Sequence, residues 1–355
     1  DGSIFRTSGI ITEAMQGASD GALTTYLLTI EDPMILLNHR QNSRIFLNKS
    51  EIEVIKILHE EWCQRSQLYA SSSKLDLREL REHYETKTQI TQLNETDWAF
   101  IQRLLKRIHV NFLQRETEAF VSSFTTEIQQ KKFNLFDDNR FFDQLKRKSI
   151  RFHRSDATER FDSITQFIAK RRLQPTLVQV QRWRADQLKQ EAVWNISKHK
   201  HSETTKNINT GLEISHAISP ASIPDLKQRD GADPAKFSQI EKLAQQQIYK
   251  YDQASKEFLA KSTVRDAEVG GWFELVGHDA VDHHKGDDNQ YKIIAKSFYT
   301  QNNLPKDLNT QVNQLIQESQ WSIKNLADEK KFEIYQMRVN KISFNLESKL
   351  FYSPK

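Results

Sequence analysis

Cysteine is almost absent from this sequence, and its scarcity limits the kinds of site that the chain can build. The 355 residues include one cysteine, Cys63, so neither an internal disulfide nor a cysteine-based zinc site can form. This usage is typical of a protein made in a reducing compartment. Because Cys63 lies in a stretch with helical spacing of apolar residues, we expect it to act as a small buried hydrophobic side chain.

Glycine is also scarce, and several familiar catalytic motifs are missing. The ten glycines form no glycine-rich phosphate loop, which disfavours nucleotide-dependent enzymes. Neither a G-x-S-x-G turn nor an H-E-x-x-H pair occurs, so the two commonest hydrolase signatures are absent. From these absences the sequence predicts no cofactor.

Long hydrophobic runs are missing as well. No uninterrupted run of about 18 apolar residues occurs, and the mean hydropathy is −0.70. The sequence therefore predicts no membrane span. The first residues lack the basic and apolar regions of an ordinary secretion signal, so we expect no signal of that kind.

Aromatic and charged residues, by contrast, are plentiful. Hydrophobic residues make up 37% of the chain, with 20 Phe and 6 Trp, which rules out an intrinsically disordered protein. The length predicts about two domains. A formal net charge of +4 is too mild for a nucleic-acid coat, and we expect no nucleic-acid partner. A local basic excess between residues 140 and 184 fits an acidic protein partner or plain solvation equally well.

The first part of the chain shows a hairpin followed by two helices. Apolar and Thr residues recur in residues 4–11 and 23–30 around a Gly- and Asp-containing loop, which predicts a β-hairpin. Ser50 followed by Glu53 fits a capping box at the start of a helix near 50–62. A second helix is expected near 94–106, with Asn94 as its cap.

The second part alternates short strands with one long helix. Apolar residues hold helical spacing near 236–260, the strongest periodic signal in the chain, and a final amphipathic helix is expected over 308–321. Residues 198–233 are rich in polar residues and proline, which predicts a long loop. Strands are expected at 108–112, 119–124, 132–136, 149–152, 163–168, 176–181, 263–265, 272–276 and 291–299.

One cluster of histidines and carboxylates could hold a metal. His278, His283, His284 and Asp287 fall within eleven residues, and such side chains coordinate divalent ions. Their spacing matches no established metal motif, and the surrounding residues are typical of a solvated loop between two strands. The tract His199–His201 has the same two interpretations. A metal-dependent hydrolase built on the first cluster is therefore an alternative, and a plain loop is the favoured interpretation.

Four segments in a fixed order resemble a known family. The hairpin followed by Asn42–Ser50 is similar to the "D-S-R-I-F-x-x-K-S" stretch of VgrG, the spike protein of bacterial type VI secretion systems. Residues 94–104 resemble its "E-S-D-x-x-F-x-x-R-L" helix, and residues 262–278 resemble its "S-x-x-R-x-L-x-x-G-x-x-F-x-L-x-x-H" segment. Three shorter stretches look like VgrGs of the Acinetobacter type: residues 151–154, 174–176 and 302–305.

The resemblance implies a mainly β (α+β) fold like that of the phage baseplate hub, with two related β-barrel domains and flanking helices. It implies a first barrel region over residues 1–130, incomplete at its N-terminus, and a second over 131–322. Residues 323–355 would then form a linker toward an OB-fold and needle. Where many relatives read "E-G-I" after the second helix, this chain has Arg107, Ile108 and His109.

The resemblance also implies a structural role without catalysis. The chain would form a homotrimer that adapts the hexameric Hcp tube to the spike needle, with a PAAR tip and effectors as further partners of a full-length protein. It would stay in the bacterial cytoplasm until firing and then leave through the type VI apparatus without a signal peptide. A phage or phage-tail-like baseplate hub is the alternative. The matching residues are expected to be fold determinants: Arg44, Phe46, Ser50, Asp97, Arg103, Arg265, Gly270, Phe273 and His278.

Overall fold

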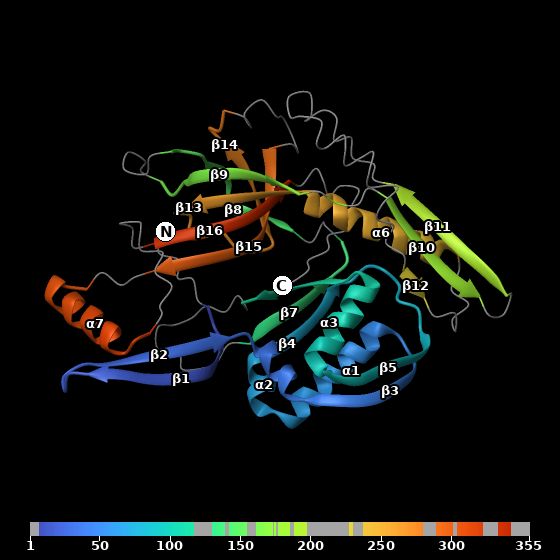
Figure 1. Ribbon diagram of the computed structural model, residues 1–355, viewed down its shortest axis with the longest axis horizontal. Helices are drawn as coiled ribbons and strands as arrows, with labels where there is room; N and C mark the ends of the chain where they lie inside the picture. The colour runs from blue at the N-terminus through green and yellow to red at the C-terminus, as the bar shows by residue number, and fades with distance from the viewer. Residues whose placement is uncertain are drawn as a thin grey trace.

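The computed structural model shows a mainly β protein with several helices (Figure 1). The strands fall into five sheets, and each of these sheets has a helix in contact with it. The mainly β class with flanking helices is therefore confirmed. The structure describes residues 7–116, 130–138, 142–154, 161–172, 174, 177–184, 188–196, 227–229, 237–279, 289–300, 304–321 and 333–341.

The chain begins with the predicted hairpin, which projects from the body of the molecule (Figure 1). Strands β1 (Ile10–Ser19) and β2 (Thr24–Glu31) pair antiparallel. The turn between them is held by Asp20, whose carboxylate accepts hydrogen bonds from the amides of Ala22 and Leu23. The late helix α7 (Lys306–Glu318) lies against this hairpin, so segments from opposite ends of the sequence meet here.

The first hydrophobic core lies around helices α1 and α3, between a two-stranded ribbon and a three-stranded sheet (Figure 1). Leu58 from α1, Phe100 from α3 and Leu135 from β7 are fully buried in it. The ribbon pairs β3 with β5, and the sheet has the order β4-β7-β6. The elements are η1 (Pro33–His39), β3 (Gln41–Lys49), α1 (Glu51–Arg65), α2 (Gln67–Ser72), β4 (Ser73–Glu79), β5 (Lys87–Thr96), α3 (Asp97–Ile108), β6 (Asn111–Arg115) and β7 (Lys131–Phe136).

Both helices of this core begin at side-chain caps, but one cap differs from the prediction. The capping box of α1 is confirmed, because Ser50 accepts from the Glu53 amide and the Glu53 carboxylate accepts from the Ser50 amide. Helix α3 is capped by Thr96, so the prediction of Asn94 is wrong. Asn94 takes a left-handed conformation with φ 48°, which leaves Thr96 in the extended geometry that a cap requires.

The end of α3 places a histidine in a conformation that favours glycine. His109 adopts φ 58°, the left-handed conformation of a helix C-cap, and its amide donates to the Leu105 carbonyl. A residue with a side chain is strained in this region. The turn is therefore kept, at a conformational cost that glycine would not incur.

The second part of the chain is built on a six-stranded sheet with the order β8-β14-β15-β16-β13-β9. Its inward side chains alternate along the strands, as Phe273 and Leu275 do on β14 and Phe258 and Ala260 do on β13. The strands are β8 (Asp143–Arg151), β9 (Ile164–Arg171), β13 (Lys256–Ser262), β14 (Gly271–Val276), β15 (Gln290–Thr300) and β16 (Glu333–Lys341).

The two outer strands of this sheet approach each other. An isolated parallel bridge joins Phe152, just after β8, to Ile164 at the start of β9. The His153 amide donates to the Ile164 carbonyl oxygen at 2.9 Å. In the first part of the chain, the described strands form separate sheets of two, two and three strands.

A third, smaller core lies where α6 (Phe237–Ser255) packs on the sheet β11-β10-β12. Val178, Val180 and Val193 from the sheet meet Ala244 and Ile248 from the helix. The strands are β10 (Leu177–Arg184), β11 (Lys189–Ile196) and β12 (Lys227–Arg229). Most of the loop predicted over 198–233 lies outside the described residues.

Two predicted boundaries in the second part are wrong for the same reason. Helix α6 ends at Ser255, and the residues expected to continue it form β13, which pairs with β9 and β16. The strand expected at 263–265 is instead the loop after β13. Strand pairing buries Phe258 and Ala260 in the sheet, and this tertiary contact overrides the helical spacing of the sequence.

The predicted linker over 323–355 also needs correction. Residues Glu333–Lys341 form β16, which lies between β13 and β15 in the six-stranded sheet. Strand β7, which starts at the expected boundary near residue 131, pairs with β4 and β6 and buries Phe133 in the first core. Strand pairing thus places β7 with the first part of the chain. It places β16, the last described strand, with the second part.

Candidate functional site: a buried charge network and exposed apolar ribbons

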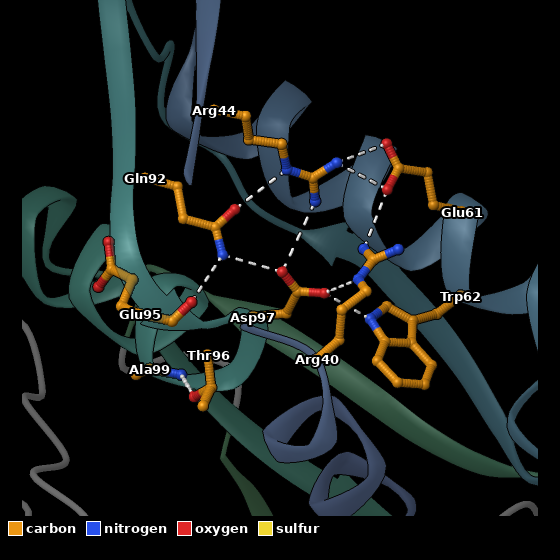
Figure 2. Close-up of polar contacts among 9 residues, drawn as sticks. All are labelled: Arg40, Arg44, Glu61, Trp62, Gln92, Glu95, Thr96, Asp97 and Ala99. Carbon is orange, nitrogen blue, oxygen red and sulfur yellow. Dashed lines mark hydrogen bonds and ion pairs between the residues drawn. The ribbon is translucent and has the colours of Figure 1, made fainter. Parts of the chain in front are cut away.

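A buried carboxylate brings two of the sequence motifs together. Asp97, the first residue of α3, has no exposed side-chain surface. Its carboxylate accepts hydrogen bonds from the Arg40 guanidinium, from Trp62 Nε1 at 2.8 Å and from Gln92 Nε2 at 2.9 Å (Figure 2). These donors come from the residue between η1 and β3, from α1 and from β5. One side chain thus contacts three elements of the first core.

A second carboxylate completes the network. Arg44 Nη1 donates to both oxygens of Glu61 at 2.9 and 2.8 Å, and Arg44 Nη2 lies 3.6 Å from the Asp97 carboxylate. Arg40 Nη2 donates to Glu61 at 2.9 Å (Figure 2). Two guanidinium groups and two carboxylates balance each other, which a buried set of charges requires.

Local sequence explains how the network forms. Asp97 lies at the helix N-terminus, where the dipole of α3 favours a negative charge. Arg44 and Gln92 are cross-strand partners on the inward face of the ribbon, so both point at the helices. Arg103, nearly two turns further along α3, pairs with Glu95 and donates to the Thr91 carbonyl at 2.7 Å. The network therefore attaches the ribbon to α1 and α3.

The remaining motif residues of the first region serve the same junction. The Phe46 ring stacks on Phe100 with ring centroids 5.9 Å apart, beneath the Arg44 guanidinium. Ser50 closes the junction by capping α1 where β3 ends. Arg44, Phe46, Ser50, Asp97 and Arg103 thus converge on one place, although they are up to 59 residues apart in sequence.

A cysteine and a histidine lie close together on α1, but their setting is unlike that of a catalytic pair. Cys63 Sγ is 3.8 Å from His59 Nε2, which accepts the Leu75 amide at 3.1 Å. His59 Nδ1 lies 2.9 Å from the Tyr69 hydroxyl. Burial lowers the pKa of His59 and raises the pKa of Cys63, whereas a nucleophilic cysteine needs a lowered pKa. Sequence reasoning missed this cluster, which the i, i+4 spacing of His59 and Cys63 could have signalled.

The histidine cluster of the second region is only partly described. His278 follows β14, and its ring lies 4.5 Å from Phe152 and 5.7 Å from Phe167, measured between centroids. His283, His284, Asp287 and the tract His199–His201 lie outside the described residues. In the part of the chain that is described, no three histidine, cysteine, aspartate or glutamate side chains gather as they would around a metal ion.

The other motif residues of the second region occupy the start of β14. Gly270 has φ 84°, and its amide donates to the Ile293 carbonyl at 3.0 Å. A Cβ at this position would collide with Leu113 of β6, so glycine permits both the turn and the close approach of the two regions. Phe273 is fully buried in the sheet core, and Arg265 is exposed in the loop after β13.

Exposed apolar side chains gather on the two ribbons. The hairpin carries Ile11, Tyr26, Leu28 and Ile30, each 47% to 62% exposed. The β3–β5 ribbon carries Ile45, Leu47 and Leu93, each 58% to 73% exposed. Apolar faces of this kind mark surfaces that contact other molecules. None of the helices within the described ranges has the length and apolar character that crossing a bilayer would take.

Several solved structures share this fold. One is the E. coli protein c3393, a component of the type VI secretion system with structural similarity to the T4 phage tail proteins gp27 and gp5. It matches with a TM-score of 0.52 and 12% identity over 97% of this chain. A tail protein from Neisseria meningitidis matches with a TM-score of 0.54 and 10% identity, over 96% of this chain and 82% of its own length. This chain spans 62% of the E. coli protein, less than two thirds.

A third match comes from a prophage. The 43 kDa tail protein of prophage MuSo2 from Shewanella oneidensis has a TM-score of 0.51 and 9% identity, over 94% of this chain and 78% of its own. No curated protein matches this chain in sequence. At these identities the similarity establishes the fold alone.

The family is settled by the sequence itself. A family model described as the phage tail baseplate hub (GPD) matches residues 1–304, most of the chain. This match and the hub-like fold confirm the resemblance that the ordered motifs indicated. The chain belongs to the phage tail baseplate hub family.

Proposed function

We propose that this protein is the hub at the base of a type VI secretion spike, a homotrimer that connects the Hcp tube to the needle during contractile delivery of effectors. The observation that carries the proposal is the baseplate hub match over residues 1–304. The type VI assignment is supported by the VgrG-like motif order and by the fold shared with the E. coli type VI component. The role is mechanical, so it requires rigid domains and large interfaces and no catalytic group.

The proposal includes two barrel domains. The second would be closed by the contact between β8 and β9, where Phe152 bridges to Ile164 around an apolar interior. The first, incomplete at its N-terminus, would use the sheets around α1 and α3. We keep the division near residue 130, but assign β7 to the first domain because it pairs with β4 and β6.

The motif residues would act as fold determinants of these domains. Arg44, Phe46, Ser50, Asp97 and Arg103 hold the ribbon on the helices of the first domain. In the second domain that role falls to Arg265, Gly270, Phe273 and His278. None of them would touch substrate, since the proposed hub is not an enzyme.

Partners and location follow from the same proposal. The trimer would contact the Hcp hexamer through one face, and in a longer protein the needle would carry a PAAR tip and effectors. It would assemble in the bacterial cytoplasm and leave through the type VI apparatus at firing, without a signal peptide.

Solution mass and tube binding test this proposal. Sedimentation velocity of the purified chain at micromolar concentration should give a species of three protomers, and that species should bind Hcp rings in a pull-down. A protein that stays strictly monomeric and ignores Hcp would contradict the proposal.

A phage or phage-tail-like hub is the second candidate, favoured by the fold shared with the Neisseria tail protein and the MuSo2 tail protein. The same pull-down separates the two. Binding to a phage tail tube protein, with no binding to Hcp, would identify the chain as a phage-type hub.

A further inference from the structure

The base of the hairpin is attached to the first core by one group of polar side chains. Ser8, just before β1, donates from its amide to one carboxylate oxygen of Glu116 at 2.9 Å and from its hydroxyl to the other. Asp32, just after β2, accepts a hydrogen bond from Lys131 Nζ at 2.5 Å, and the same Nζ lies 3.5 Å from Glu116. We call these four residues the base cluster. It ties both ends of the hairpin to β6, which Glu116 follows, and to β7, which Lys131 begins.

The base cluster is a firm attachment. The Lys131 side chain is only 11% exposed, and it contacts two carboxylates, one from each side of the cluster. Hydrogen bonds with an ionised partner are about twice as strong as those between neutral groups. Lys131 itself lies on a strand that pairs with β4 and with β6. The base of the hairpin therefore cannot leave the first core without breaking charge-assisted hydrogen bonds.

The outer end of the hairpin is held by a different part of the chain. Ser319, directly after α7, accepts the Ala18 amide at 2.8 Å, and its hydroxyl lies 3.2 Å from that of Thr25. A Cβ on Gly17 would collide with Ser319 and with the Trp321 ring, so the approach is close. We call this the tip contact. Figure 1 shows α7 beside the outer part of β1 and β2.

Helix α7 is in turn tethered to the six-stranded sheet. It lies in the connection between β15 and β16, which pair with each other. Strand β15 ends at Thr300 and α7 begins at Lys306, so the chain between them can span at most about 20 Å. Whatever fixes the position of α7 therefore also restricts the sheet of the second part.

The two attachments lie at opposite ends of a long, thin element. At about 3.3 Å per residue, β1 places them roughly 30 Å apart. Substitutions at sites this distant, without shared partners, usually have independent effects. A two-stranded hairpin, however, is at best marginally stable by itself. It depends on the contacts at its ends, and this dependence can carry the effect of one end to the other.

We propose that the hairpin is a strap that couples the two parts of the chain: the base cluster fixes it on the first core, the tip contact holds α7, and the order of α7 depends on the base cluster. Loosening either end loosens the other, because such coupling between two sites is reciprocal. The strap keeps α7, and the sheet to which α7 is tethered, in place relative to the first core. This coupling belongs to one chain, so it requires neither assembly nor a partner.

Hydrogen–deuterium exchange of the whole chain tests the coupling. Lys131→Met keeps the apolar stem but removes the charge that Asp32 and Glu116 share. It should speed the exchange of the α7 amides, residues 306–318, about tenfold or more, although the change lies at the far end of the hairpin. Lys132→Met is the matched control, because it removes the same charge one residue along β7 on the opposite face, and it should leave α7 unchanged.

The amides of α1 and β14 serve as references for the two cores in the same experiment. An α7 that exchanges as in the wild type after Lys131→Met, or that speeds up only as much as these references, would overturn the proposal. Ser8→Ala provides a milder base variant, since it removes one hydroxyl and leaves the charges in place. It should speed α7 exchange about threefold, in line with the loss of a single hydrogen bond.

A tip variant and the double variant complete the test. Gly17→Ala adds a methyl group where α7 approaches, so it should speed the exchange of α7 and also of the Ser8 and Ile10 amides at the base. In a strap, both substitutions release the same unit. Gly17→Ala combined with Lys131→Met should therefore exchange at α7 at most a few-fold faster than the faster single variant. If the two effects multiply in full, or if Gly17→Ala leaves the base unchanged, the ends act independently and the proposal is wrong.

Discussion

The first core and the six-stranded sheet are held together in different ways. Around Asp97 the first core joins a ribbon to two helices through paired charges, two arginines against two carboxylates. The interior of the sheet is apolar and aromatic, with the Phe167 ring stacked on Phe258 at 5.0 Å and edge-on to Tyr291 at 5.1 Å.

The difference follows from the kind of element that has to be positioned. Within a sheet, strand pairing and the alternation of side chains already decide which residues face inward. A ribbon that lies on helices has no such ladder to fix its placement, so directional contacts must do it. Buried charges cost free energy, but they accept few alternative arrangements.

The largest expected effect comes from breaking the charge network. Asp97→Ala leaves Arg40 and Arg44 without their buried partner and should destabilise the protein by about 3–5 kcal/mol. Urea unfolding measures the change. The exposed pair of Arg103 and Glu95 gives the comparison, since Arg103→Ala should cost about 1 kcal/mol or less. Equal effects of the two substitutions would contradict the assignment of Asp97 as the centre of the junction.

The second effect is a gain in stability. Lys292 of β15 is fully buried, its Nζ has no hydrogen-bond partner among the described residues, and it lies 5.4 Å from the centre of the Phe142 ring. Burial lowers the pKa of Lys292 well below its ordinary value. Lys292→Met keeps the apolar stem without the charge and should stabilise the protein by about 1–4 kcal/mol.

The pH dependence gives this prediction its sign. Because the folded pKa of Lys292 is lowered, its charged form opposes folding, and this penalty shrinks as the pH rises toward the unfolded value of about 10.4. The advantage of Lys292→Met over the wild type should therefore decrease between neutral pH and pH 10, as followed by thermal unfolding. An advantage that stays constant with pH would show that the lysine keeps its proton in the folded protein over this range, which would contradict the lowered pKa.

A smaller loss is expected at the start of α1. Ser50→Ala removes the hydroxyl that accepts the Glu53 amide and should cost about 1 kcal/mol. Ser50→Gly should cost only about a few tenths of a kcal/mol, because glycine is itself tolerated at a cap. Unfolding midpoints in urea distinguish the two. If neither substitution lowers the unfolding midpoint, the cap does not contribute to the stability of the protein.

The smallest effect at neutral pH concerns His59. Nε2 of its buried ring accepts a hydrogen bond from the Leu75 amide. Protonation would convert Nε2 into a donor, which would then face the N–H of Leu75, a second donor. Its pKa is lowered in the folded state, so stability should fall as the pH drops below about 6.5 and level off below the folded pKa. His59→Gln should reduce this slope between pH 7 and pH 5. The same substitution at the exposed His39 should leave it unchanged.

Local patterns predicted most elements, but they failed where distant strands compete with local spacing. The hairpin, the capping box at Ser50 and the helices α1, α3 and α7 follow from periodicity and caps, which act over a few residues. The strand Lys256–Ser262 and the strand Glu333–Lys341 could not be found in this way, because each is defined by partners far along the chain. The convergence of Arg44 with Asp97 was hidden for the same reason.

The amino-acid sequence by itself determined the family and the absence of the common catalytic motifs, since ordered motifs and composition can be read without coordinates. Only the tertiary structure decided that two motifs meet at one buried carboxylate, that β16 enters the sheet between β13 and β15, and that α7 packs on the hairpin. The physical reason is that burial and ion pairing depend on distances between residues that chain order does not specify.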